Sequence, residues 1–196
     1  MGQYYFPCIL KKNWKLAKQP VKMTLYSWDF DNGMKLMEHS YVGNSFVMSV
    51  LYLLAHTFKG LPFAWVGDYA DKKMTHAHPE GVDIYSMASG LTDGGSGHNL
   101  YELYKKAIPD YAKLHNYRYI INRTKKEYVV VPEYKPSMWQ IHPLPILCSD
   151  GNGRGGGDYN KASKFVGRWA YDVIDVSDDE KEVKGYKCIR PRFKED

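Results

Sequence analysis

The stretch NSFVMSVLYLLAHTFKG, residues 44–60, decides the fold because it predicts a helix that is apolar on more than one side. Asn44 is a favourable N-cap residue, and Gly60 and Pro62 end the helix. A helix that is apolar around most of its circumference is buried on most of it, so we expect this helix to be the central core element. Its apolar residues are Phe46, Val47, Met48, Val50, Leu51, Leu53, Leu54 and Phe58.

Around this helix the sequence predicts mainly strands. Two early strands pair as a hairpin or near neighbours, a later pair flanks a short polar link as a second hairpin, and residues 72–98 are expected to be irregular. A second helix begins at Asn99, carries an apolar stripe to Ile108 and ends at Pro109. The expected strands are Gln3 to Leu10, Lys22 to Phe30, 63–71, Tyr117 to Asn122, Glu127 to Val131, Trp139 to Leu147 and Val166 to Val176.

These elements predict an α+β fold, a single globular domain over residues 1–196 with a mostly antiparallel sheet packed on two main helices. A chain of 196 residues is long enough to bury a sizeable core, and no linker divides it. We expect the central helix to pack on strands that carry Ile120, Val129, Ile141 and Val173.

Composition limits the partners and the compartment. The formal charge of +5 comes from scattered lysines and arginines, which is typical of a solvated surface and argues against a nucleic-acid partner. Cys8, Cys148 and Cys188 are far apart and form no C-x-x-C pair, so we expect no disulfide and no zinc site, as in a reducing cytoplasm. No export signal or membrane-spanning stretch is predicted, so we expect a cytoplasmic protein without membrane contact.

The run DGNGRGGGDY, residues 150–159, is the main functional signal. Glycines cluster where the backbone needs positive φ or where a ligand approaches the main chain closely. Successive backbone N–H groups in such loops bind anions, and Arg154 adds a planar donor suited to phosphate or carboxylate. The run matches neither the P-loop nor the dinucleotide fingerprint, and a tight surface turn between two strands is the alternative interpretation.

Two segments place an aspartate three residues after a tryptophan: Trp65 with Asp68, and Trp169 with Asp172. In a strand these side chains point to opposite faces, so each tryptophan can pack while each aspartate faces water or a common cleft. Chance recurrence is the alternative. The expected ligand-binding residues are Asn152, Gly153, Arg154, Gly155, Gly156, Gly157, Asp158, Trp65 and Trp169.

Catalytic groups are less clearly indicated. His142 precedes a rigid proline segment that would aim its imidazole toward the glycine run, although a structural histidine is the alternative. Cys148 could be activated by His142, but a cysteine that ends an apolar strand is usually a small hydrophobe. His76 and His78 lack a third ligand at characteristic spacing, so we predict no metal site, and no cofactor is indicated. The candidate catalytic residues are His142, Asp158 and Asp68.

Several motifs together resemble an uncharacterised family of bacterial and bacteriophage proteins, in the same order across nearly the whole chain. The resemblance implies a bacterial or phage intracellular protein and no particular activity. The chain departs from the family pattern at Tyr171, where a glycine is usual, and at Arg123, where a histidine is usual. The motifs are MGQYY (1–5), NGMKLME (32–38), WVGDYAD (65–71), YIINRTKKEYV (119–129), IHPLPIL (141–147), the glycine run and VGRW (166–169).

Three classes of function fit these signals. The first is a protein that binds and sequesters a small phosphorylated ligand, such as a nucleotide, through the glycine run. The second is a hydrolase or transferase acting on such a ligand, which also needs a proton-transfer group within reach of the run. The third is a structural or protein-interaction role. We favour binding of a small anionic ligand, because no nucleophile–base pair is recognisable in the sequence.

Overall fold

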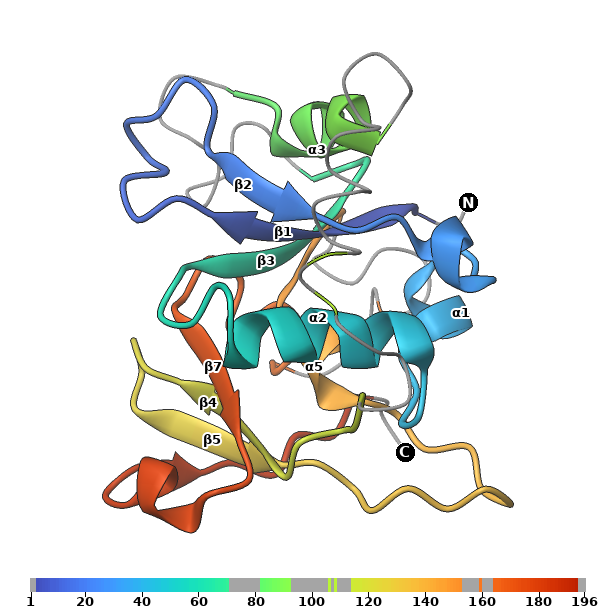
Figure 1. Ribbon diagram of the computed structural model, residues 1–196, viewed down its shortest axis with the longest axis vertical. Coiled ribbons are helices and arrows are strands. Elements are labelled where there is room, and N and C mark those ends of the chain that lie inside the picture. Colours follow the sequence, from blue (N-terminus) through green and yellow to red (C-terminus); the bar gives the residue numbers. More distant parts are fainter. Residues whose placement is uncertain are drawn as a thin grey trace.

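Two four-stranded sheets and two main helices make up the described part of the computed structural model (Figure 1). It describes residues 3–70, 82–92, 106, 108, 114–152, 159 and 164–193. Each sheet is mostly antiparallel and contains one parallel pair of strands. The predicted α+β class is confirmed.

The first sheet has the strand order β2-β1-β3-β6. Strand β1 (Tyr5–Leu10) pairs antiparallel with β2 (Val21–Thr24) and with β3 (Phe63–Gly67), which confirms that the first two strands are neighbours. The second expected strand is shorter than predicted, because the 3-10 helix η1 (Ser27–Phe30) follows it. Strand β6 (Ser149–Asp150) adds to β3 in parallel.

The second sheet has the order β7-β4-β5-β8. Strands β4 (Tyr119–Asn122) and β5 (Glu127–Val130) form the predicted hairpin. Strand β7 (Ile174–Ser177) pairs antiparallel with β4, and β8 (Lys187–Cys188) pairs in parallel with β5. The 3-10 helix η3 (Glu180–Val183) connects β7 to β8.

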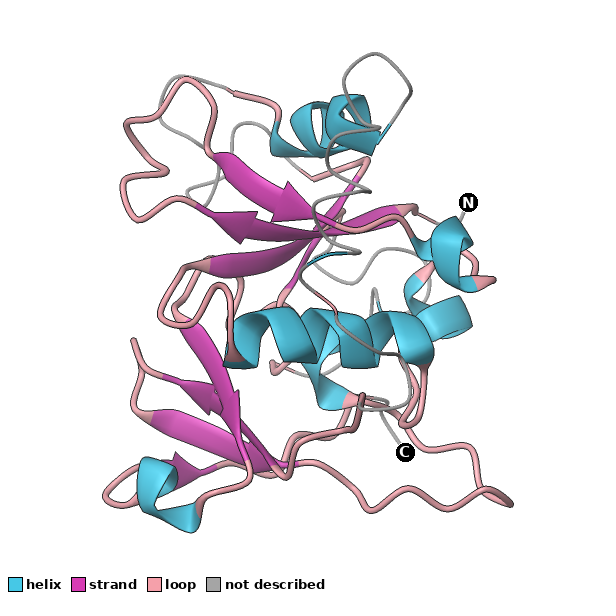
Figure 2. Ribbon diagram, viewed as in Figure 1, coloured by secondary structure: helices cyan, strands magenta, loops and turns pink. Residues whose placement is uncertain are grey.

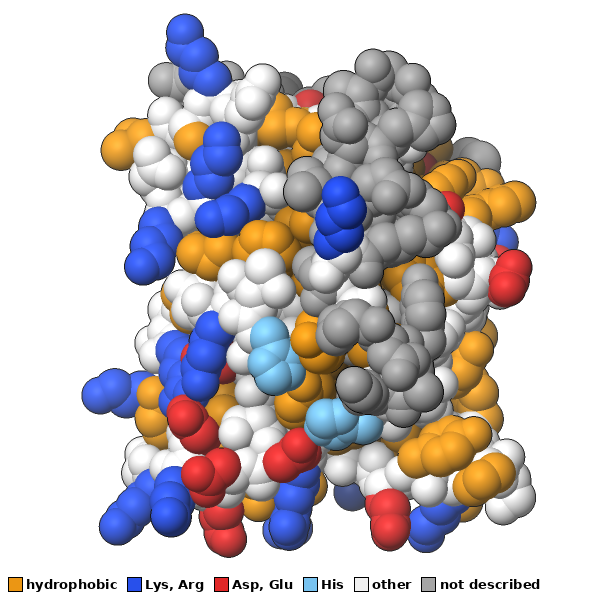
Figure 3. All heavy atoms as spheres, in the orientation of Figure 1, with side chains coloured by type: hydrophobic (Ala, Val, Ile, Leu, Met, Phe, Trp, Pro, Cys, Tyr) orange, Lys and Arg blue, Asp and Glu red, His pale blue; other side chains and the backbone are white. Residues whose placement is uncertain are grey.

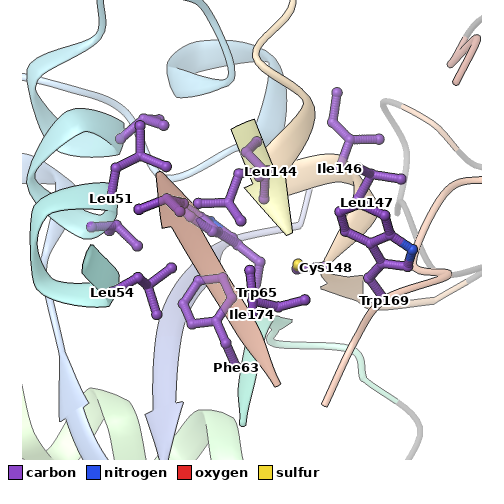
Figure 4. Close-up of a cluster of buried hydrophobic side chains, with 14 of the residues drawn as sticks. Leu51, Leu54, Phe63, Trp65, Leu144, Ile146, Leu147, Cys148, Trp169 and Ile174 are labelled. Carbon is purple, nitrogen blue, oxygen red and sulfur yellow. The ribbon is translucent and has the colours of Figure 1, made fainter. Parts of the chain in front are cut away.

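Helix α2 (Ser45–Ala55) lies between the two sheets (Figures 1 and 2). Its start is fixed as predicted, because Asn44 Oδ1 accepts a hydrogen bond of 3.1 Å from the backbone N–H of Val47. Its apolar residues share one buried cluster with residues of both sheets. Figure 4 shows Leu51 and Leu54 of this helix facing Trp65. The two-sided burial explains why apolar residues occur around most of the helix.

The first sheet is covered on its other face by α3 (Ile84–Thr92), which contacts β1 and β2. This helix lies within residues 72–98, so the prediction of an irregular segment there was wrong. The signal was present in the sequence but was not recognised. Ile84 and Ala88 are buried, Met87 and Leu91 pack beside them, and these four residues have the i, i+3, i+4, i+7 spacing of a helix. The helix expected from Asn99 to Ile108 lies outside the described residues, except for Lys106 and Ile108.

The prediction of a strand from Trp139 to Leu147 was wrong. Ile141 forms a single bridge to Tyr41, and the helix α5 (Pro143–Leu147) follows. Proline suits the first turn of a helix, because the backbone N–H groups of that turn have no acceptor within the helix and the N–H that proline lacks is not needed there. All five residues of α5 are buried, so the sequence shows no helical period. The short helix α1 (Leu36–His39) lies at the start of the segment that leads to α2.

The predicted core is confirmed in large part. The main buried cluster contains the apolar residues expected on the central helix face, together with the strand residues Ile120 and Val129. Ile141 packs against this cluster. Val173 does not belong to it, because β7 begins only at Ile174 and presents Ile174 and Val176 to the core. Among the described helices, none has the length and apolar character needed to cross a membrane.

Replacing Leu51 with alanine tests the central position of α2. Leu51 is fully buried, so we expect Leu51→Ala to lower the free energy of unfolding by about 2–5 kcal/mol in chemical denaturation. Leu16→Ala is the control, because Leu16 is 81% exposed and its truncation should change stability by less than about 0.5 kcal/mol. Equal stability of Leu51→Ala and wild type would contradict the central role of α2.

Candidate ligand site at the carboxyl ends of β3 and β6

The glycine run begins at the carboxyl end of a parallel strand pair. Strands β3 and β6 are in register with Val66 opposite Asp150, so both chains leave the sheet at the same edge. Asp68 follows β3 and Asn152 follows β6 at this edge. The described residues thus include Asn152 but not the rest of the expected loop site, which is Gly153, Arg154, Gly155, Gly156, Gly157 and Asp158.

The N-terminal segment joins the two strand ends. The backbone N–H of Tyr4 donates to Asp68 Oδ1 at 3.2 Å, and the backbone N–H of Asn152 donates to Gln3 Oε1 at 3.1 Å. The hydroxyl of Tyr5 donates to the same Gln3 oxygen at 3.0 Å. Asp68 and Asn152 are therefore each bonded to the N-terminal segment, Asp68 to Tyr4 and Asn152 to Gln3, and the sequence did not reveal this role of the segment.

Two glycines make room for this junction. A Cβ on Gly67 would lie 2.9 Å from the Tyr5 ring and 3.0 Å from Gln3 Oε1. A Cβ on Gly151 would overlap both Gln3 Oε1 and the Tyr5 hydroxyl. Gln3 is 4% exposed and Tyr5 is 1% exposed, so neither side chain can move aside into solvent. The first glycine of the run is therefore required for close packing, independently of any ligand.

A tyrosine holds the carboxylate that ends β6. The Tyr171 hydroxyl donates to Asp150 Oδ2 at 2.6 Å, and the Tyr171 ring stacks on Trp14 with centroids 4.8 Å apart. Burial and the nearby Asp150 carboxylate raise the pKa of Tyr171 well above its ordinary value, so the phenol stays protonated and donates. Its φ of +69° is a left-handed conformation that favours glycine.

The chain that returns from the run is anchored to the second sheet. Glu127 accepts hydrogen bonds from Arg168 Nη2 at 2.5 Å and from Trp169 Nε1 at 3.0 Å. Burial opposes ionisation of Glu127, but these bonds outweigh it and lower the pKa of this carboxyl. The backbone N–H of Trp169 also donates to Leu147 O at 2.7 Å. The described chain is therefore anchored both at Asn152 and at Arg168 and Trp169.

Both tryptophans proposed as ligand contacts lie in the core. Trp65 and Trp169 are each 0% exposed and belong to the main buried cluster (Figure 4). Their aspartates do not share a site. Asp68 follows the carboxyl end of β3, whereas the Asp172 carbonyl accepts from the N–H of Phe63, at the start of β3. The Asp172 carboxylate accepts from Asn122 and Lys125 of the second sheet.

The candidate catalytic residues are separated. His142 is fully buried as the N-cap of α5, where its Nδ1 accepts from the N–H of Leu144 at 3.3 Å. Its described contacts do not include the loop edge, and burial lowers its pKa to about 3. Asp68 does lie at the edge, and burial raises its pKa above the ordinary value despite hydrogen bonds from backbone N–H groups. Asp158 lies outside the described residues.

Cys148 is fully buried, and burial raises the pKa of its thiol, which suits a core residue. Within the part of the chain that the structure describes, no three His, Cys, Asp or Glu side chains are placed to hold a metal ion.

Comparison with known proteins identifies no relative of this chain. No protein-family model, curated protein or solved structure matches the chain. The chemistry of this edge must therefore be inferred from its own residues.

Adding one methyl group at the loop root tests the junction. We expect Gly151→Ala to lower stability by about 1–3 kcal/mol, because the new Cβ would overlap Gln3 and Tyr5. Gly90→Ala is the matched control. Gly90 lies within α3 with no atom within 4 Å of an added Cβ, so that change should stabilise by about 0.5–1 kcal/mol. An unaffected Gly151→Ala protein in urea denaturation would show that the junction is not closely packed.

Two buried histidines should make the protein sensitive to acid. Burial lowers the pKa of His39 to about 4, although a bond to the Gly33 carbonyl and the Glu38 charge oppose it, and the pKa of His142 to about 3. Unfolding returns both to about 6.5, so the unfolded chain binds more protons below that pH. The contribution of the two neutral histidines to the free energy of unfolding is therefore fully present above about pH 6.5. It decreases as the pH falls toward the folded pKa values.

Between about pH 7 and about pH 5, we expect each histidine to lower the free energy of unfolding, measured by urea denaturation, by about 2 kcal/mol. His142→Asn should remove its share of this pH dependence, because the amide oxygen can still accept from Leu144 but does not titrate. The same pH dependence in His142→Asn and wild type would contradict the assignment.

Proposed function

We propose that the protein binds a small phosphorylated ligand of the nucleotide type at the carboxyl edge of β3 and β6. The supporting observation is that the glycine run follows β6 where two parallel strands end together. In open α/β sheets, ligands bind outside the carboxyl ends of the parallel strands, and the β3–β6 pair repeats that arrangement locally in a mostly antiparallel sheet. The Gln3 and Tyr5 junction holds the start of the run, and a fixed start lowers the cost of ordering the loop on a ligand.

The chemistry of the run favours an anion. Glycine-rich backbone can turn several N–H groups toward one point, and Arg154 is the only cationic residue in the run. The N–H of Asn152 is bonded to Gln3, so the ligand would be bound by later N–H groups of the run. The Asp150 and Asp68 carboxylates at the edge already accept hydrogen bonds from Tyr171 and Tyr4.

Binding without turnover is the form of the proposal that the described residues favour. His142 lies in the interior as a helix cap, so it is not available to a ligand at this edge as a general base. Asp68, with its raised pKa, is the described group at the edge best suited to accept a proton. A hydrolase or transferase would act through Asp68. A protein that binds without turnover would sequester its ligand, in a bacterial or phage setting as the resemblance implies.

Truncation of Arg154 tests the proposal. Mononucleotides, dinucleotides and cyclic nucleotides are screened by thermal shift and titration calorimetry, with wild type and Arg154→Ala in parallel. A hydrogen bond from a charged donor contributes about 1.5–3 kcal/mol, so we expect Arg154→Ala to weaken binding roughly ten- to a hundredfold. Arg118→Ala is the matched control, because Arg118 directly precedes β4 in the second sheet.

The outcomes separate the alternatives. Product formation from any bound ligand would replace the sequestering role with an enzymatic one. Equal affinity of wild type and Arg154→Ala would remove Arg154 from the site, and absence of binding by every compound would contradict the proposed ligand class.

A further inference from the structure

A cavity lies on the second sheet, apart from the candidate site at the edge of β3 and β6. It has a volume of about 710 Å³ and is formed by the end of β5, by β8 with the chain that follows it, and by the segment before α5. The volume is within the range of small-molecule sites, about 300–1,000 Å³. The glycine run is not part of its described lining.

The floor of this cavity is apolar and belongs to the core. Val129, Ile189 and Phe193 line it and are members of the main buried cluster. The N–H of Ile189 donates to Tyr128 O at 2.8 Å, so β8 and its continuation hold their place beside β5. A ligand that enters therefore meets a fixed apolar surface and not a loosely ordered one.

The walls are rigid. Pro132, Pro143 and Pro191 come from three different segments, and each proline ring fixes its own φ. Trp139 adds a flat apolar surface and is 54% exposed. Figure 3 shows hydrophobic side chains gathered on the surface at the lower right, over the segment between β5 and α5. A preformed apolar wall with an exposed aromatic is a favourable binding surface, because little order must be gained on binding.

One charged group defines the polar part of what the cavity recognises. Arg190 is the only charged residue among the described residues that line it, and it is exposed. Its planar guanidinium is suited to pair with a carboxylate. Gln140 also lines the cavity, but its Oε1 is buried and does not open into it. The site thus offers one cation beside an apolar surface.

We propose that this cavity binds an amphipathic carboxylate, a molecule with one carboxylate group and a long acyl chain. The carboxylate pairs with Arg190, and the acyl chain lies on Trp139 and the apolar floor. This site is independent of the proposed phosphorylated ligand, which would bind at the edge of the first sheet.

Cys188 provides a direct readout of occupancy, because it lines the cavity and its residue is exposed. Cys8 and Cys148 are fully buried, and burial raises the pKa of both thiols. An aromatic disulfide reagent should therefore label one thiol per chain in the folded protein, and Cys188→Ser should abolish this labelling. N-decanoyl-leucine should slow the labelling severalfold and saturably, whereas its methyl ester should protect weakly.

Variants assign the contacts. Arg190→Gln should weaken protection by the acid roughly ten- to a hundredfold and leave protection by the ester unchanged. Trp139→Ala should weaken protection by both compounds. Lys187→Gln is the matched control, because Lys187 is an exposed cation of β8 that does not line the cavity, and its loss should change protection by less than about twofold.

Three results in the labelling experiment would overturn the proposal: no protection by N-decanoyl-leucine, equal protection by the acid and the ester, or equal protection in wild type and Arg190→Gln. Labelling of more than one thiol per chain after the ligand is added would also overturn it, because the acyl compound would then be unfolding the protein. Stronger protection by an apolar peptide with a free carboxyl terminus would replace the small molecule with a protein terminus as the occupant.

Discussion

Burial of α2 between the two sheets is the constraint on which the rest of the structure depends. This one helix contributes apolar side chains to a cluster that also contains Phe63 and Trp65 of β3 and Ile174 of β7. Because α3 covers the opposite face of the first sheet, β1 and β3 are buried on both faces. The positions of β3 and of every segment bonded to it are therefore set by the core.

The two proposed sites are consequences of this arrangement. The late part of the chain is tied to β3 by backbone bonds from Trp65 to Cys148 and from Tyr171 to Phe63, so the end of β6 and the chain that returns from the glycine run are both fixed. On the second sheet, β8 joins β5 and leaves an apolar hollow beside the proline-rich segment before α5. In our proposals, the first site would offer backbone N–H groups and Arg154 to an anion, and the second would offer an apolar surface with Arg190.

How much the sequence predicts depends on how local the determining contacts are. The start and the apolar face of α2 are predicted well, because Asn44 and the apolar residues are local signals, but the helix ends at Ala55 and not at the predicted Gly60. The helix α5 is not predicted, because complete burial removes the period by which a helix is recognised. The glycine run is recognised by composition, but its anchor, the bond from Asn152 to Gln3, joins residues 149 positions apart. The cavity at Arg190 unites three distant segments, and no local signal indicates it.

The most direct test of this account is to follow the backbone amide resonances by NMR while a nucleoside diphosphate is added. Ligand binding at this edge should produce saturable shifts at Gly67, Asp68, Gly151 and Asn152, because these residues form the described edge of the first site. Resonances of Ile189 and Arg190 should not move, because they belong to the other cavity. Shifts confined to Ile189 and Arg190, or no saturable shift at the edge, would contradict the assignment of the phosphorylated ligand to the carboxyl ends of β3 and β6.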